Sequence, residues 1–172
     1  MSVWDYSTAK KGDPLPTLTL GPINQDDLVL YANASGDQNP IHIDQNFAKK
    51  SGLPDVIAHG MLIMSYLGRL LTNTVPQSQI KNFSVQFSNM THLNQTIICT
   101  GKILEKNSIG NKQVVTLGLK VEDLNSTVFL KKVKGIGFKD SEGRVVLNEA
   151  EEIVPKRLLE NDLPGVAWDL LP

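Results

Sequence analysis

The chain has 172 residues, of which 41% are hydrophobic and 20% charged, and these proportions exclude a largely disordered protein. This length suits a single domain that can bury a sizeable core without disulfides, and the lone cysteine, Cys99, excludes a disulfide framework. The 17 basic and 18 acidic residues nearly cancel, so the chain lacks the basic surplus that general nucleic-acid binding requires.

The first part of the chain, up to about residue 75, has the patterns of loops and helices. Residues 15–20 alternate between apolar and polar side chains and predict a short edge strand. Asn24 is suited to cap a helix that ends near Ser35 and Gly36, and Asp44 is suited to cap a second helix over residues 45–51.

Residues 60–74 predict the most apolar helix of the chain, and Pro76 follows its end. Its apolar side chains fall on almost every face, which predicts a helix buried all round. These side chains are Met61, Leu62, Met64, Leu67 and Leu71.

Four strands are predicted in the second part, over residues 83–87, 97–103, 115–121 and 127–138. The short connections between them favour an antiparallel meander, and the single apolar face of each strand needs a cover. The fold class is therefore predicted to be α+β, with an antiparallel sheet wrapped around the long central helix. We expect one domain over residues 1–147 and a C-terminal extension over 148–172 that packs on the domain or on a partner subunit.

The residues best suited to chemistry lie between Tyr31 and His42. Asp37 and His42 would diverge on a helix, but Gly36 and Pro40 supply the bends that let both side chains face one point. A carboxylate beside an imidazole can hold a water molecule and move its proton near neutral pH. The alternative is that Asp37 caps a turn and His42 is a satisfied structural histidine.

This segment resembles the signature of the MaoC-like, or hydratase 2, family. The matching residues are Tyr31, then Ser35-Gly36-Asp37-Gln38-Asn39-Pro40-Ile41-His42, then Ala48. A second block, Ile57-Ala58-His59-Gly60-Met61-Leu62, resembles the start of the family's central helix.

The resemblance implies a hot-dog fold and a lyase that reversibly hydrates trans-2-enoyl thioesters to (R)-3-hydroxyacyl thioesters. It implies that Asp37 and His42 activate water and that the Gly60 amide binds the oxyanion. His59 and Asn39 are further candidates for contact with substrate, although both also suit a structural role in the loop. The substrate would be a thioester of CoA or of acyl-carrier protein, and the protein would be a homodimer or a heterodimer with another hot-dog chain.

The histidines at 42, 59 and 92 lack the spacing of metal ligands, and no glycine-rich dinucleotide motif is present, so we expect neither metal nor cofactor. His92 falls in a predicted turn and is expected to be exposed. The sequence has no apolar run of membrane-spanning length and no apolar core of a signal peptide at its start, so the prediction is a cytoplasmic protein. Two alternatives remain open, a hot-dog thioesterase and a non-catalytic subunit of a heterodimeric dehydratase.

Overall fold

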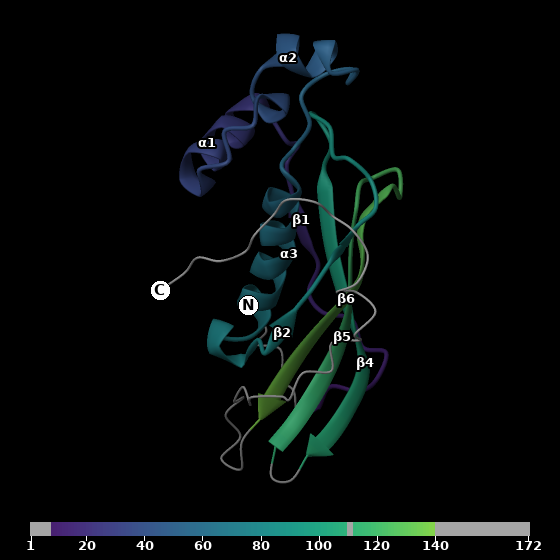
Figure 1. Ribbon diagram of the computed structural model, residues 1–172. Coiled ribbons are helices and arrows are strands. Elements are labelled where there is room, and N and C mark those ends of the chain that lie inside the picture. Colours follow the sequence, from purple (N-terminus) through teal and green to yellow (C-terminus); the bar gives the residue numbers. More distant parts are fainter. Residues whose placement is uncertain (1–7, 110–111, 140–172) are drawn as a thin grey trace, which may run out of the picture.

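The computed structural model describes residues 8–109 and 112–139 (Figure 1). The first half of this part contains β1 (Leu18–Leu20), α1 (Gln25–Ser35), the 3₁₀ turn η1 (Pro40–His42), α2 (Gln45–Lys50) and α3 (Gly60–Thr74). The second half contains the 3₁₀ turn η2 (Gln77–Gln79), β2 (Asn82–Phe83), β3 (Gln86–Phe87), β4 (Ile97–Ile109), β5 (Lys112–Glu122) and β6 (Val128–Lys139). The predicted extension over 148–172 and its boundary with the domain lie outside the described residues.

The strands form one antiparallel sheet in the order β1-β4-β5-β6-β2, and β3 also pairs with β6. The long strands β4, β5 and β6 follow one another as the predicted meander (Figure 1). The predicted strand over 83–87 is instead two short strands, because the pairing of β2 and β3 with β6 shifts by one residue between them. Strand β1 is shorter than predicted, with three residues, all of which pair with β4.

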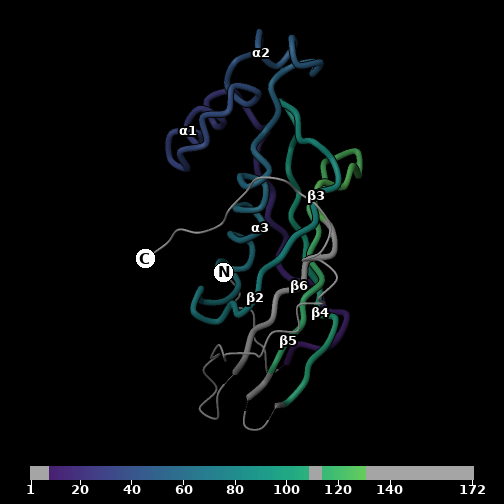
Figure 2. The backbone as a smooth tube through the Cα atoms, in the orientation of Figure 1, coloured from purple at the N-terminus to yellow at the C-terminus, as the bar shows by residue number. Residues whose placement is uncertain are grey.

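Helix α3 lies along one face of the sheet, and its inward side forms the middle of the core (Figure 2). The buried side chains of α3 are Leu62, Ile63, Leu67, Leu70 and Leu71. The prediction of a helix buried all round is wrong, because the sheet covers one side and leaves Met61 48% exposed on the other. Within the described residues, no helix is both long and apolar enough to cross a membrane.

The short helices begin and end where local interactions predict. The side chain of Asn24 accepts a hydrogen bond from the amide of Asp27, and the Asp27 carboxylate accepts one from the amide of Asn24. Gly36 then ends α1 with a φ of 78°, a conformation that favours glycine. Asp44 caps α2 through the amides of Asn46 and Phe47. These caps place the Asp37–His42 segment in the short connection between α1 and α2.

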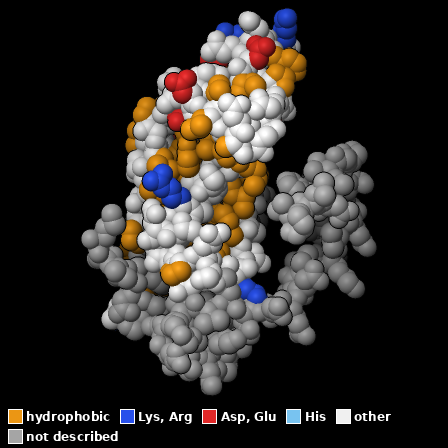
Figure 3. All heavy atoms as spheres, turned by 90° about the vertical axis from the view of Figure 1, so that its left-hand side faces the viewer, with side chains coloured by type: hydrophobic (Ala, Val, Ile, Leu, Met, Phe, Trp, Pro, Cys, Tyr) orange, Lys and Arg blue, Asp and Glu red, His pale blue; other side chains and the backbone are white. Residues whose placement is uncertain are grey.

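The side of the molecule formed by α1 and α3 carries much exposed apolar surface (Figure 3). The large exposed hydrophobic side chains of these two helices are Val29, Leu30 and Met61, and Phe47 of α2 is also exposed. Exposed apolar surface of this kind commonly marks a site of protein–protein contact.

Candidate active site

The connection between α1 and α2 is a compact loop that folds back through two side-chain hydrogen bonds. The Asp37 carboxylate accepts a bond of 3.2 Å from the amide of Asn39, and the side-chain oxygen of Asn39 accepts one of 3.2 Å from the amide of Ile41. The Asn39 side chain therefore caps η1, and η1 carries His42 at its end. The sequence predicts that this loop bends, and the two hydrogen bonds formed by the Asp37 and Asn39 side chains stabilise the bend.

His42 is buried, with 8% of its surface exposed, and its ring is fixed by one hydrogen bond. Nδ1 lies 2.7 Å from the carbonyl oxygen of Ile57. Because a carbonyl can only accept, Nδ1 must carry the proton and donate. In the neutral imidazole this leaves the lone pair on Nε2, which is the nitrogen that can act as a base.

His59, which precedes α3, is 1% exposed and contacts both members of the predicted pair. Its Nε2 donates to the backbone carbonyl of Asp37 across 3.1 Å, and its ring stacks on that of His42 with centroids 3.9 Å apart. Nδ1 of His59 is buried and has no hydrogen-bond partner among the described residues. Burial lowers the pKa of His59, the bond to Asp37 opposes this, and the charge of His42 lowers the pKa further.

The structure brings the polar atoms of Asp37, His42 and His59 within 4.8 Å of one another. Asp37 is exposed, whereas the two histidines are buried. The stacked imidazoles are inclined by only 29°, so their lone pairs lie in two nearly parallel planes, which is unlike the converging ligands of a zinc ion. The arrangement suits proton transfer to and from a small molecule better than it suits chelation.

Gly60 is the first residue of α3, where an amide has no acceptor within the helix and the helix dipole is positive. Gly60 is exposed and borders a pocket. A β-carbon added here would lie 3.0 Å from Cε1 of Phe87, so glycine is what lets this pocket-lining ring pack closely against the start of α3. The structure therefore places a helix N-terminal residue beside the pocket, and its role as an oxyanion donor stays a prediction.

The pocket has a volume of about 660 Å³ and reaches from His42 and Gly60 toward the core. Its other walls come from residues 87–92 and 127–130, with Ile63, Phe129 and Leu130 as buried apolar lining. Asp37, Asn39 and His59 are not lining residues; the first two lie in the neighbouring loop and His59 is behind His42. The space is large enough for an apolar chain and ends beside an imidazole.

Sequence reasoning missed the wall formed by residues 87–95. His92, expected to be exposed, is half-buried and lines the pocket, because its backbone pairs with that of Ile57. The neighbouring carbonyl of Thr91 accepts a hydrogen bond of 2.8 Å from the amide of Ala58. No motif marks this segment, since its place depends on pairing with residues more than thirty positions earlier in the chain.

A family model described as the MaoC like domain matches residues 8–125. The chain belongs to this family, and its sheet and helix have the hot-dog fold, as the sequence predicts. Over 88% of its length the chain superposes on 94% of the R-hydratase PhaJ1 from Pseudomonas aeruginosa, with a TM-score of 0.69 and 24% identity. That likeness concerns the fold.

Two curated relatives resemble the chain over most of their own length. The mitochondrial 3-hydroxyacyl-acyl-carrier-protein dehydratase of Arabidopsis thaliana is 27% identical over 69% of this chain and 70% of its own. The (R)-specific enoyl-CoA hydratase of Rhodospirillum rubrum is 28% identical over 58% of this chain and 73% of its own. Both names denote hydro-lyases. Matches to fatty acid synthase beta subunits of Cochliobolus carbonum and Saccharomyces cerevisiae span only 3% and 4% of those chains.

Proposed function

We propose that this protein is a hydro-lyase that reversibly adds water to trans-2-enoyl thioesters and forms (R)-3-hydroxyacyl thioesters. The observation that carries the proposal is the meeting of Asp37, His42 and His59 within 4.8 Å beside an apolar pocket. Family membership supports the reaction class, and the names of relatives support the substrate class.

In the hydration direction, Asp37 and the free Nε2 of His42 hold one water molecule between them. The water oxygen bonds to C3 of the enoyl group while the pair takes a proton from the water. The C2–C3 double bond shifts its electrons toward the thioester carbonyl, and a proton from the pair is then delivered to C2. Dehydration follows the same steps in reverse, so no oxidant, reductant or metal is required.

The Gly60 amide is the proposed donor to the thioester oxygen, on which negative charge develops as the enolate forms. A donor aimed at such an oxyanion is worth about 3–4 kcal/mol of barrier in other acyl-transfer enzymes. The positive end of α3 adds to this stabilisation. The apolar pocket would hold the acyl chain with its carbonyl near Gly60.

His59 and Asn39 are proposed to hold the pair rather than to exchange protons. His59 stacks on the ring of His42 and binds the backbone of Asp37, so one neutral side chain contacts both. Asn39 keeps the loop closed through the amide of Ile41. The exposed apolar side of α1 and α3 supports assembly as a homodimer, and a cytoplasmic location stays a prediction. Relatives are named for both acyl-carrier-protein and CoA substrates, so both carriers belong in the assay.

Crotonyl-CoA and crotonyl-acyl-carrier protein provide the test, with the full chain purified alone. A hydratase removes the enoyl absorbance and releases no free thiol, and chiral analysis of the product gives the (R) alcohol. Release of thiol would instead identify a thioesterase. A folded chain that shows no turnover until another hot-dog subunit is added would identify a non-catalytic partner, and either result rejects the proposal.

A further inference from the structure

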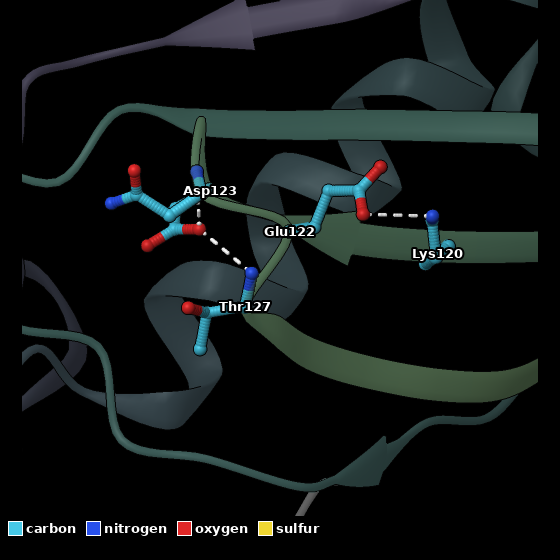
Figure 4. A network of polar contacts seen from close by, with 5 residues as sticks. Lys120, Glu122, Asp123 and Thr127 are labelled. Carbon is cyan, nitrogen blue, oxygen red and sulfur yellow. Dashed lines mark hydrogen bonds and ion pairs between the residues drawn. The ribbon is translucent and has the colours of Figure 1, made fainter.

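A second buried polar group lies outside the proposed catalytic pair, at the turn that joins β5 to β6. Asp123 is 4% exposed, and it is the only buried carboxylate among the residues whose side chains the structure describes. One carboxylate oxygen accepts hydrogen bonds from the amides of Asn125, at 2.9 Å, and Thr127, at 2.8 Å (Figure 4). The other oxygen accepts one of 2.9 Å from the side-chain amide of Gln95.

These bonds keep Asp123 charged in a buried place. Burial raises the pKa of its carboxyl, but the bonds from Thr127, Asn125 and Gln95 outweigh burial and hold the pKa below its ordinary value. A carboxylate that is ionised can only accept hydrogen bonds. The NH₂ group of Gln95 must therefore face Asp123.

The orientation of Gln95 in turn fixes the pocket wall. With its nitrogen committed to Asp123, its side-chain oxygen accepts a hydrogen bond of 2.6 Å from the amide of His92. Gln95 and His92 both line the pocket. The Asp123 carboxylate thus holds the loop over 88–95 through the side-chain amide of Gln95, in which both the nitrogen and the oxygen form hydrogen bonds.

That loop forms hydrogen bonds directly with residues 57 and 58, which lie just before the proposed site residues His59 and Gly60. His92 pairs with Ile57, and the carbonyl of Thr91 accepts from the amide of Ala58. The carbonyl of Ile57 is the acceptor that orients His42. His59 and Gly60 follow immediately along the chain. A continuous series of hydrogen bonds and backbone pairs therefore connects Asp123 with the imidazole and the helix amide.

We propose that Asp123 and Gln95 are positioning residues, which hold residues 57–60 so that the His42 ring and the Gly60 amide face one substrate. The proposal rests on the function proposed above, and it adds two residues that no motif marks. Neither side chain exchanges protons with substrate. Their contribution is geometric, and a misplacement of about 1 Å can cost roughly 100-fold in rate.

The hydrogen-bond chemistry allows a swap experiment. In Asp123→Asn, the new NH₂ faces the NH₂ of Gln95, and turning the Gln95 amide over only moves the clash to the amide of His92. In Gln95→Glu, two carboxylates face each other. In the double variant, the carboxylate now at position 95 accepts from both the His92 amide and the amide now at position 123. The oxygen at 123 keeps its bonds to Asn125 and Thr127.

Each single variant is expected to lower kcat by about 10- to 100-fold. The double variant should recover kcat to within about threefold of wild type. KM is expected to change less than kcat in Asp123→Asn. The matched control is Glu122→Gln, which breaks the adjoining surface ion pair with Lys120, 2.8 Å long, and should leave kcat unchanged (Figure 4).

Thermal unfolding and the ¹⁵N shift of His42 Nδ1 are measured without substrate on the wild type and on all four variants, the control included. A folded Asp123→Asn variant with unchanged kcat and an unchanged His42 shift overturns the proposal, as does a folded double variant without recovery. If the wild type hydrates no enoyl thioester, the function proposed above fails. In that case the positioning role is still supported if the ¹⁵N chemical shift of His42 differs from wild type in the single variants and returns to the wild-type value in the double variant.

Discussion

The rings of His42 and His59 are stacked with their centroids 3.9 Å apart, and each ring has one nitrogen committed to a backbone carbonyl. His42 donates to Ile57 and His59 donates to Asp37, so both tautomers are set by the main chain. His59 is the more deeply buried of the two, and its burial lowers its pKa and disfavours its protonated form.

Asp37→Asn and His42→Ala should each remove nearly all turnover, because the proposed mechanism has the two groups hold and activate the same water molecule. Their loss should be non-additive, so the double variant should lose little more than either single variant. The measurement is the rate of crotonyl-CoA hydration, with circular dichroism to verify the fold. Asp26→Asn, which neutralises an exposed acid in the first turn of α1, is the control. Near wild-type rates in either single variant would refute the assignment.

Gly60→Ala should lower kcat/KM by about tenfold or more, because the added methyl group meets the pocket-lining ring of Phe87 and pushes it toward the position proposed for the thioester. Gly68→Ala is a matched control on the same helix, since its β-carbon would lie 3.6 Å from Phe83, an ordinary contact. Gly68 lies inside the helix, where alanine is favoured by up to about 1 kcal/mol, and thermal unfolding of both variants separates a loss of stability from a loss of rate. Equal rates for the two variants would count against an approach of substrate to Gly60.

His59 should make the protein less stable in acid. Burial lowers its pKa from the ordinary 6.5, so the unfolded chain takes up a proton before the folded chain does. The penalty is absent well above pH 6.5, grows as the pH falls below it and levels off below the folded-state pKa. His59→Gln keeps a donor for the Asp37 carbonyl but does not titrate. It should show a smaller fall in Tm between pH 7.5 and 5 than the wild type, and an identical fall would contradict this account.

Cys99 should be chemically inert in the folded protein. It is fully buried in β4, and burial raises the pKa of its thiol to about 12, so the reactive thiolate is scarce at neutral pH. A thiol reagent such as DTNB should react with it only after unfolding in urea, and incubation of the native protein should leave hydration unchanged. Rapid labelling of the native state would mean that β4 opens readily.

The helices were predictable because their signals are local. Asn24, Asp44 and Gly36 act within a few residues of where they stand, and the structure confirms the helices that they bound. The bend between Asp37 and His42 was predictable for the same reason. The burial of α3 was not, because which of its apolar side chains are covered depends on where a sheet from the other half of the chain lies.

The pocket wall required information that the linear sequence does not display. The division between β2 and β3 follows from their register on β6, and His92 is half-buried because residues 91–92 pair with 57–58. Gln95 and Asp123 are 28 positions apart and belong to no motif. Long-range pairing of this kind is set by the tertiary arrangement of the sheet and not by any local propensity.

The pocket takes its reactive end and its remaining walls from different stretches of the chain. His42 and Gly60 line one end of the pocket, Asp37 lies in the loop beside it, and all three belong to one early segment, whereas much of the lining comes from 87–92 and 127–130. Under the proposed function, selection can therefore enlarge, narrow or reshape the acyl pocket by altering the later stretches alone, while the residues proposed to activate water stay unchanged. This requires that residues 91 and 92 keep their backbone pairing with residues 57 and 58. We therefore expect changes in substrate size to follow from changes in the side chains of this wall, while its backbone conformation stays the same.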